Sequence, residues 1–172
     1  MKSKYIPLIL ILIFLITFVI FFKGLKNSNI YTPDTNLKKE VPSFNLKSFE
    51  NDSIVISEKI FKNNDYYLMN IWASWCIPCK EEHEFLMELK KDKKIQLVGF
   101  NYKDNFINAS SFLKDLGNPY DIIVSDKDGT AAIEWGAYGV PESFLVHQNK
   151  IIKRFIGPIN NEDLLEIQKI IR

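Results

Sequence analysis

The sequence predicts an α/β domain in which helices pack on a central sheet, with one membrane-spanning helix before it. Short apolar runs typical of buried strands alternate with amphipathic helical patterns. Their order is strand–helix–strand–helix and then strand–strand–helix. An uncharged run of seventeen residues, Ile6–Phe22, precedes them. With 172 residues, the chain can hold one domain of ordinary size and this segment.

The N-terminal apolar run is long enough to cross a bilayer. Seventeen helical residues at ~1.5 Å each reach about 26 Å, the short end of what spans a hydrocarbon core. Lysines flank the run on both sides, so the charges do not decide its orientation. A cleaved secretory signal is the alternative, but such a signal usually has a shorter apolar region and an alanine-rich cleavage site, and the first alanine here is Ala73. We expect an uncleaved anchor over residues 1–23, held in lipid through residues 6–22.

Composition excludes several classes of function. Lys and Arg number 22 against 21 for Asp and Glu, a net charge of +1. Because there is no basic excess of the kind that binds phosphate backbones, a nucleic acid is not an expected partner. The chain has 2 cysteines, which excludes a disulfide-stapled scaffold and a metal site with four cysteine ligands.

The elements of the domain follow from local pattern. Residues 24–41 are polar and read as a linker, and the folded domain is expected over residues 42–172. The expected strands are Phe44–Leu46, Ile54–Ile56, Tyr66–Ala73, Gln96–Phe100, Ile122–Val124, Ser143–Val146 and Ile151–Ile156. The expected helices run from the second cysteine to about Lys91, over Phe106–Leu116, and from a cap at Asn160 or Asn161, with Leu164, Leu165, Ile167 and Ile171 on the apolar side.

The two cysteines, Cys76 and Cys79, stand between a buried strand and a helix. In this setting the Cys-x-x-Cys spacing is typical of redox chemistry. The start of a helix favours the thiolate, so we expect Cys76 to be the nucleophile and the more shielded Cys79 to be the resolving thiol. Trp75 flanks the nucleophile, and Pro78 lies in the first turn, where its missing N–H is dispensable. Dithiol–disulfide exchange of this kind needs no cofactor.

A metal site is the alternative for the same cysteines. His83 lies four residues after Cys79 and seven after Cys76, so all three could share one helix face. His147 or a carboxylate would have to complete tetrahedral zinc. The strand–helix junction is unlike a zinc-ribbon knuckle, and we therefore favour redox chemistry.

A second motif is Gly139-Val140-Pro141-Glu142-Ser143-Phe144. Because proline cannot donate a ladder hydrogen bond, an ordinary turn before a strand is the plain interpretation. Taken alone, the motif would leave the bond before Pro141 trans.

Together these motifs resemble a known family. WASWCIPC with a distant GVPESF is similar to the thioredoxin superfamily, and more closely to the DsbE/CcmG family of cytochrome c biogenesis thiol:disulfide interchange proteins. The matching segments, which cover roughly residues 40–172, are Val41–Phe44, Leu68–Cys79, Lys80–His83, Asn101–Asp104, Leu116–Tyr120 and Tyr138–Leu145.

The resemblance implies a thioredoxin-like three-layer sandwich with an extra N-terminal β-hairpin. It also implies a single-pass protein of the bacterial inner membrane whose C-terminal domain lies on the periplasmic side. Such a reductase keeps the haem-attachment cysteines of apocytochrome c, or a thiol protein of the assembly system, reduced. A membrane electron transporter in turn re-reduces it. A general envelope reductase of another pathway is the alternative.

The resemblance also assigns roles to residues. Cys76 attacks, Cys79 resolves, Pro141 is a cis-proline, and the backbone of Val140 binds a substrate chain. Glu82 and Glu142 correspond to the family's acidic residues near the active site, although Glu82 could merely belong to the solvated start of the helix.

The chain differs from its better-known relatives at two places. Asn70 stands where many thioredoxins carry a buried aspartate, which agrees with the neutral residue of the DsbE/CcmG pattern. Ile77 and Pro78 replace the proline–threonine pair common in the family, and residues between the cysteines tune thiolate stability.

Overall fold

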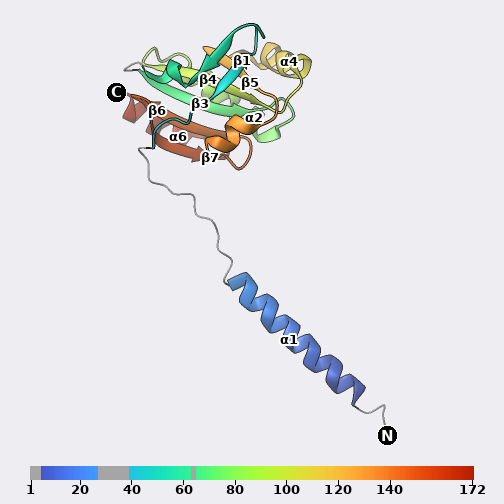
Figure 1. The fold of residues 1–172 in the computed structure, drawn as a ribbon. Coiled ribbons are helices and arrows are strands. Elements are labelled where there is room, and N and C mark those ends of the chain that lie inside the picture. The colour runs from blue at the N-terminus through green and yellow to red at the C-terminus, as the bar shows by residue number, and fades with distance from the viewer. Residues whose placement is uncertain (1–4, 27–38, 63–64) are drawn as a thin grey trace. The chain divides into compact units, whose positions relative to one another are not determined.

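The computed structural model describes residues 5–26, 39–62 and 65–172 (Figure 1). The chain divides into two compact units, Met1–Thr35 and Asn36–Arg172. Each unit is considered by itself.

The first unit is the helix α1, Ile6–Lys26. Its first eighteen residues, Ile6–Lys23, are apolar enough to cross a membrane, and none of them is buried by protein. The hydroxyl of Thr17 donates to the carbonyl oxygens of Ile13 and Phe14, at 3.0 and 2.9 Å. This polar group is therefore satisfied within the helix, as a lipid environment requires.

The expected linker over residues 24–41 is described only at its two ends. Its first three residues continue α1, and residues 27–38 lie outside the described part of the chain. At its far end Glu40 forms an antiparallel bridge with Lys150, and the N–H of Val41 donates to the carbonyl of Asn149 at 3.0 Å. The last residues of the expected linker therefore pair with the sheet of the second unit.

The second unit is built on a seven-stranded sheet with the order β2-β1-β5-β4-β3-β6-β7. Strands β3, β4 and β5 are parallel, and the remaining pairings are antiparallel. The strands are β1 Asn45–Ser48, β2 Val55–Ser57, β3 Tyr66–Trp72, β4 Ile95–Tyr102, β5 Ile122–Asp126, β6 Glu142–His147 and β7 Lys150–Ile156. The expected N-terminal hairpin, β1 and β2, extends the sheet beyond β5.

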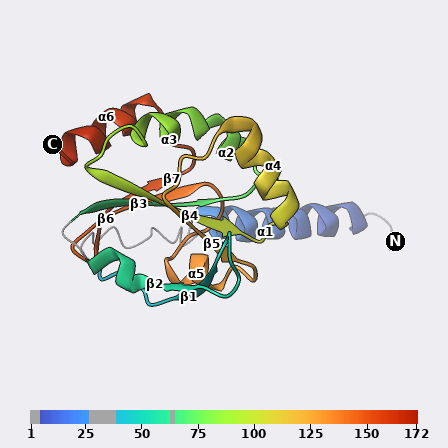
Figure 2. The same ribbon diagram turned by 90° about the horizontal axis from the view of Figure 1, so that it is seen from above.

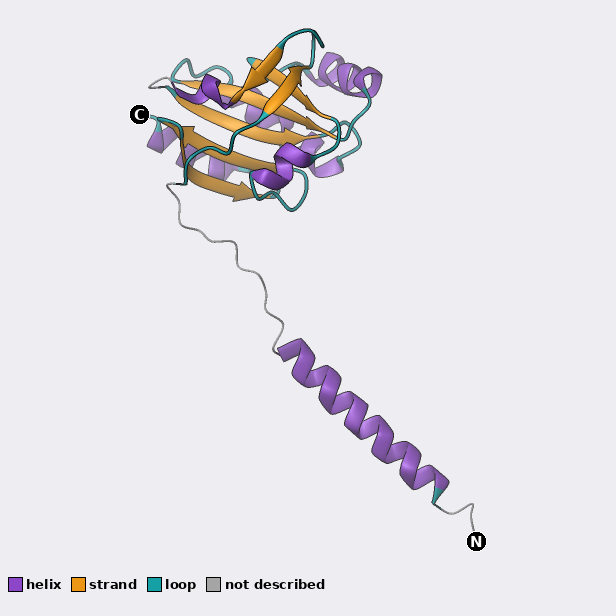
Figure 3. Ribbon diagram, viewed as in Figure 1, coloured by secondary structure: helices purple, strands orange, loops and turns teal. Residues whose placement is uncertain are grey.

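Helices cover both faces of this sheet, which gives the three expected layers (Figure 3). Figure 2 shows α2, α3, α4 and α6 on one side of the central strands and α5 on the other. The helices are η1 Glu58–Lys62, α2 Ile77–Glu81, α3 His83–Leu89, α4 Phe106–Leu116, α5 Thr130–Glu134 and α6 Asn161–Ile170.

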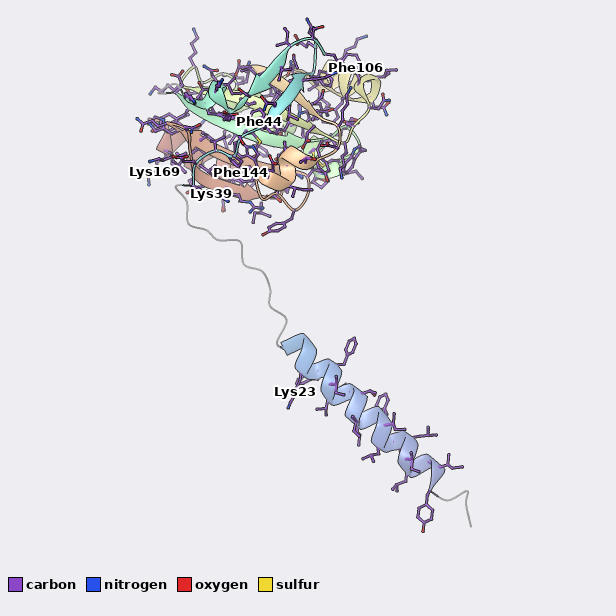
Figure 4. The ribbon with its side chains drawn as sticks, viewed as in Figure 1. Lys23, Lys39, Phe44, Phe106, Phe144 and Lys169 are labelled. Carbon is purple, nitrogen blue, oxygen red and sulfur yellow. A yellow bond between two sulfur atoms is a disulfide. The ribbon has the colours of Figure 1, made fainter. Side chains whose placement is uncertain are left out.

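Two hydrophobic clusters fill the spaces between the layers. Because side chains alternate across a strand, consecutive residues of the central strands enter different clusters. Leu68 and Leu145 join the cluster that also contains Cys76 and Cys79. Phe144, labelled with Phe44 in Figure 4, belongs to the other cluster. The central strands are buried on both faces, which explains their continuous apolar sequence.

Three local expectations are corrected. The helix expected from Cys79 to about Lys91 is divided at Glu82 into α2 and α3, although Glu82 has helical φ and ψ and keeps its backbone hydrogen bonds to Pro78 and Leu86. The short helix α5 was not expected, since only five residues form it, too few to show a helical period in the sequence. Leu165 is 58% exposed and does not join the apolar side of α6, because it lies about 100° around the helix from the buried Leu164.

Candidate active site

The site begins where β3 ends and α2 starts. Cys76 is the N-cap of α2, its Cα lies 5.3 Å from that of Cys79, and the two sulfurs form a disulfide. The backbone N–H of Cys79 donates to Sγ of Cys76 at 3.1 Å. A donor aimed at this sulfur, at the positive end of a helix, stabilises negative charge there. The geometry therefore favours ionisation of the first cysteine when the pair is reduced.

Both cysteines are buried, whereas the residues on either side of Cys76 are exposed to solvent. Cys76 is 4% exposed and Cys79 2%, so the expected difference in shielding is small in the disulfide form. Trp75 and Ile77, on either side of Cys76, are 56% and 75% exposed. Pro78 occupies the first turn of α2, as expected. A partner that reaches the disulfide meets these apolar side chains first.

The proline loop leaves the sheet beside the cysteine loop. The Val140–Pro141 peptide bond is cis, which confirms the expectation from the family resemblance and not the one from the isolated motif. In the antiparallel ladder of β3 and β6, Ile71 lies opposite Glu142. The residues that continue the two strands, toward Cys76 and back to Val140, therefore leave the same end of the sheet. The half-buried Val140 packs against the cluster that contains both cysteines.

Glu82 is fully buried, which contradicts a place on the solvated helix surface. Its Oε1 accepts a hydrogen bond from Nδ2 of Asn70 at 2.8 Å, and its Oε2 accepts one from the N–H of Ile159 at 2.8 Å. Burial raises the pKa of Glu82 from 4.5 to about 7, against the lowering effect of these two hydrogen bonds. A carboxyl group poised near neutral pH, one turn after Cys79, can hold or release a proton.

Asn70 joins Glu82 to a wider polar network inside the core. Its Nδ2 also donates to Oγ of Ser143 at 2.9 Å, and its Oδ1 accepts the hydroxyl of Tyr120 at 2.7 Å. Burial, followed by the nearby Glu82 carboxylate, raises the pKa of Tyr120 well above its usual value, so its hydroxyl remains a donor. Tyr120 and Ser143 lie in segments that match the family, but their contacts with Asn70 were not predicted, because the three residues are far apart in sequence.

Glu142 is also buried, directly after the cis-proline. Its Oε1 accepts the backbone N–H groups of Tyr138 at 2.6 Å and Gly139 at 3.3 Å. Its Oε2 accepts Nε of Arg154 at 2.8 Å and also Nη2 of the same guanidinium. The charge of Glu142 is thus paired within the protein. Arg154 was missed by sequence reasoning, since a lone arginine in a strand gives no signal.

Asp104 anchors the segment that leads into the cysteines. Its carboxylate accepts the N–H of Ser74 at 2.5 Å, the hydroxyl of the same serine at 2.8 Å and Nδ2 of Asn101 at 3.1 Å. The indole N–H of Trp75 donates to the carbonyl of Lys103 at 3.2 Å. These contacts fix the cysteine loop against the end of β4.

A pocket of about 270 Å³ lies next to this anchor. It is lined by aromatic, acidic and polar side chains: Phe49, Glu50, Asp52, Asn101, Asp104, Phe106, Ser125 and Lys127.

His83 is turned away from the metal-binding arrangement considered above. Its Nε2 lies 2.9 Å from the carbonyl oxygen of Gly117, and its ring meets the ring of Phe112 edge to face. Burial lowers the pKa of His83, so the neutral imidazole is favoured. Within the described ranges, no three His, Cys, Asp or Glu side chains are grouped closely enough to hold a metal ion.

Comparison with known proteins agrees with this geometry. The Redoxin family model matches residues 36–171. The thiol:disulfide interchange protein DsbE of Tatumella citrea is 38% identical over 166 residues, which cover 94% of this chain and 88% of that protein. The thiol:disulfide interchange protein CycY of Rhizobium leguminosarum bv. viciae is 50% identical over 100 residues, 58% of this chain and 54% of that one.

Solved structures show the same fold. A thiol:disulfide interchange protein DsbE from Chlorobium tepidum superposes with a TM-score of 0.67 at 22% identity, covering 80% of this chain and 96% of that one. The thioredoxin-like arrangement expected from the sequence is thereby confirmed. The paired cysteines at a helix N-terminus, the cis-proline loop at the same end of the sheet and the high-coverage relatives lead to one conclusion: the chain belongs to the Redoxin family, as a thiol:disulfide oxidoreductase of the DsbE-type interchange proteins in the thioredoxin superfamily.

Proposed function

We propose that this protein is a membrane-anchored periplasmic reductase of cytochrome c maturation. Its substrate would be the haem-attachment disulfide of apocytochrome c, or a thiol protein of the assembly system that serves it. The observation that carries the proposal is the Cys76–Cys79 disulfide at the start of α2, beside the loop of Pro141. The likeness to interchange proteins named DsbE and CycY supports this choice over a general envelope reductase.

The reaction transfers two electrons and balances without a cofactor. The Cys76 thiolate attacks one sulfur of the substrate disulfide, a Cys76–substrate disulfide forms, and the other substrate sulfur leaves as a thiolate that takes up a proton. The Cys79 thiolate then attacks Sγ of Cys76, the internal disulfide forms, and the second substrate thiol leaves. A dithiol of the membrane electron transporter returns the two electrons by the reverse sequence.

Glu82 is proposed to handle the proton of Cys79. The resolving thiol must lose a proton before it attacks, and it regains one when the internal disulfide is reduced. Because Glu82 is buried one turn after Cys79 and has a pKa of about 7, it can exchange a proton where water is excluded. Glu142, by contrast, is proposed to shape the substrate loop, since its charge is paired with Arg154.

The membrane arrangement is part of the proposal. Residues 1–23 would anchor the chain in the bacterial inner membrane as a single span, and residues 42–172 would face the periplasm. The linker between them would lie within residues 24–41, whose first residues continue α1 and whose last residues pair with the sheet. The apolar Ile6–Lys23 supports the anchor. The assignment of the domain to the periplasmic side of the membrane rests on the redox chemistry, because disulfide exchange with secreted proteins takes place in an oxidising compartment.

The proposal is tested by trapping the intermediate in cells. Replacing Cys79 by alanine removes the resolving thiol, so a disulfide between Cys76 and its substrate should accumulate and be identified by mass spectrometry. The matched Cys76→Ala variant should trap nothing. Deletion of the gene should abolish covalent haem attachment to c-type cytochromes. Trapped partners unrelated to cytochrome assembly, with normal cytochromes after deletion, would reassign the enzyme to another envelope pathway.

A further inference from the structure

One buried ion pair holds the proline loop in shape. Both oxygens of the Glu142 carboxylate are used: one accepts two backbone N–H groups of the loop, from Tyr138 and Gly139, and the other accepts Arg154. A further bond joins the loop to the end of β7, from the N–H of Gly157 to the carbonyl of Pro141 at 3.1 Å. The conformation of residues 138–141 thus depends on groups supplied by β6 and β7.

Arg154 makes a second contact with the same loop. Its guanidinium carbon lies 4.8 Å from the centre of the Tyr138 ring and 5.3 Å from that of Phe144. In the ladder of β6 and β7, Arg154 lies opposite Phe144, which fixes the start of its side chain. The ion pair is nearly dry, with the side chains of Arg154 and Glu142 15% and 3% exposed. Stacking and charge-assisted hydrogen bonds are stronger in such a site than in water.

The group that Arg154 supports is itself open to a partner. Tyr138 is 59% exposed, although its backbone N–H is held by Glu142 and its ring stacks on Arg154. An exposed aromatic ring with little conformational freedom contributes binding area at a low entropic cost. A polypeptide that reaches the disulfide along residues 138–141 would lie against this ring. A small disulfide has to reach only the sulfur of Cys76, so it would not contact the Tyr138 ring.

We propose that Arg154 is a positioning residue that sets the preference of the enzyme for polypeptide disulfides over small ones. It acts through Glu142 and Tyr138, and it touches neither the reacting sulfurs nor the substrate. This inference rests on the proposed function, since it deepens the account of how that site selects its substrate. Lysine would not replace arginine here, because it lacks the planar fork that binds the carboxylate while stacking on a ring.

The test compares two substrates on the full-length protein in detergent micelles, with dithiothreitol as the reductant that returns the Cys76–Cys79 disulfide to the dithiol and with its direct reaction with each substrate subtracted. One substrate is a short synthetic peptide that carries a Cys-x-x-Cys disulfide, and the other is oxidised glutathione. For Arg154→Met we expect KM for the peptide to rise about tenfold, equivalent to ~1.4 kcal/mol, with kcat nearly unchanged. The ratio of kcat/KM for the peptide to that for glutathione should fall by about the same factor. The matched control is Lys153→Met, which removes the neighbouring cation of β7 and should leave the ratio unchanged.

A second variant keeps the test decisive if Arg154→Met does not fold. Tyr138→Leu leaves the buried ion pair intact and should raise the peptide KM in the same direction. The Arg154→Lys variant should show a ratio of peptide to glutathione kcat/KM that is as low as that of Arg154→Met. Equal losses on both substrates in Arg154→Met, or an unchanged ratio in a folded Arg154→Met, would overturn the inference. If Arg154→Met does not fold, an unchanged ratio in Tyr138→Leu would overturn it. Failure of the proposed function is a different result, in which the wild-type protein reduces neither substrate.

Discussion

Replacing Glu82 by glutamine should change how the stability of the domain depends on pH. In the folded protein this carboxyl group is fully buried and its pKa is about 7, against 4.5 for the ordinary group. Between these two values the folded state holds a proton that the unfolded state has lost. Stability therefore falls as pH rises from about 4.5 to 7, and the full penalty is present above pH 7.

The size of this penalty follows from the shift. A difference of roughly 2.5 pKa units, at 1.36 kcal/mol each, is about 3 kcal/mol. Glutamine keeps the shape and removes the ionisation, and like the protonated acid it offers one carbonyl oxygen to the two donors, Asn70 and Ile159. Glu82→Gln should therefore have about the stability of wild type at pH 4.5 and gain about 3 kcal/mol relative to it by pH 8.

The measurement is urea unfolding of the oxidised full-length protein in non-ionic detergent, from pH 4.5 to pH 8. All 3 tryptophans, Trp72, Trp75 and Trp135, lie in the second unit, so fluorescence follows the unfolding of that unit. Other titrating groups are common to both proteins and cancel in the difference.

The control is Glu81→Gln, which changes the exposed neighbour of Glu82. Its stability difference from wild type should be flat over the same range. If the difference in unfolding free energy between Glu82→Gln and wild type also changed by less than about 0.5 kcal/mol over this pH range, the Glu82 carboxyl group would not bind a proton on folding. Its proposed role in proton transfer would then be wrong.

Four further substitutions test local features of the fold by the same unfolding assay. Gly129 and Gly136 both have φ of +78°, but a Cβ at Gly129 would meet neighbouring side chains at 2.5 Å and one at Gly136 would meet nothing within 4 Å. Alanine at Gly136 should therefore cost about 1 kcal/mol, and alanine at Gly129 an additional ~1–3; equal costs would contradict the crowding. Asn160→Ala removes the capping box of α6 and should cost about 1 kcal/mol, whereas no loss would mean that the cap is dispensable. Tyr120→Phe strips the hydroxyl from the buried Oδ1 of Asn70 and should cost about 1–3 kcal/mol; a neutral result would show that this hydrogen bond is replaced by water.

Much of the fold could be predicted because its signals are local. The helix Phe106–Leu116 has the bounds expected from its pattern, and Gly117 ends it with a φ of 90°. The hairpin turn at Gln148 and Asn149 has positive φ at both residues, which suits a tight connection between β6 and β7. Each of these depends on neighbours in sequence.

What could not be predicted depends on residues that are distant in sequence. The carboxylate of Glu82 is bound by Asn70 and Ile159 from other parts of the fold. Helical spacing alone places Glu82 beside other charged residues at an exposed helix start. No local pattern distinguishes it from Glu81, because both are acidic and adjacent.

The sequence by itself determined the redox pair, since three-residue spacing at a strand–helix junction brings two sulfurs together in any fold that keeps the junction. It also determined the apolar helix Ile6–Lys23, whose length and composition are sufficient to cross a membrane. Only the tertiary structure decided which charges serve the site. Glu82 became a buried acid and Glu142 the partner of Arg154 because sheet pairing and helix packing removed both from water, and burial is a property of the whole fold.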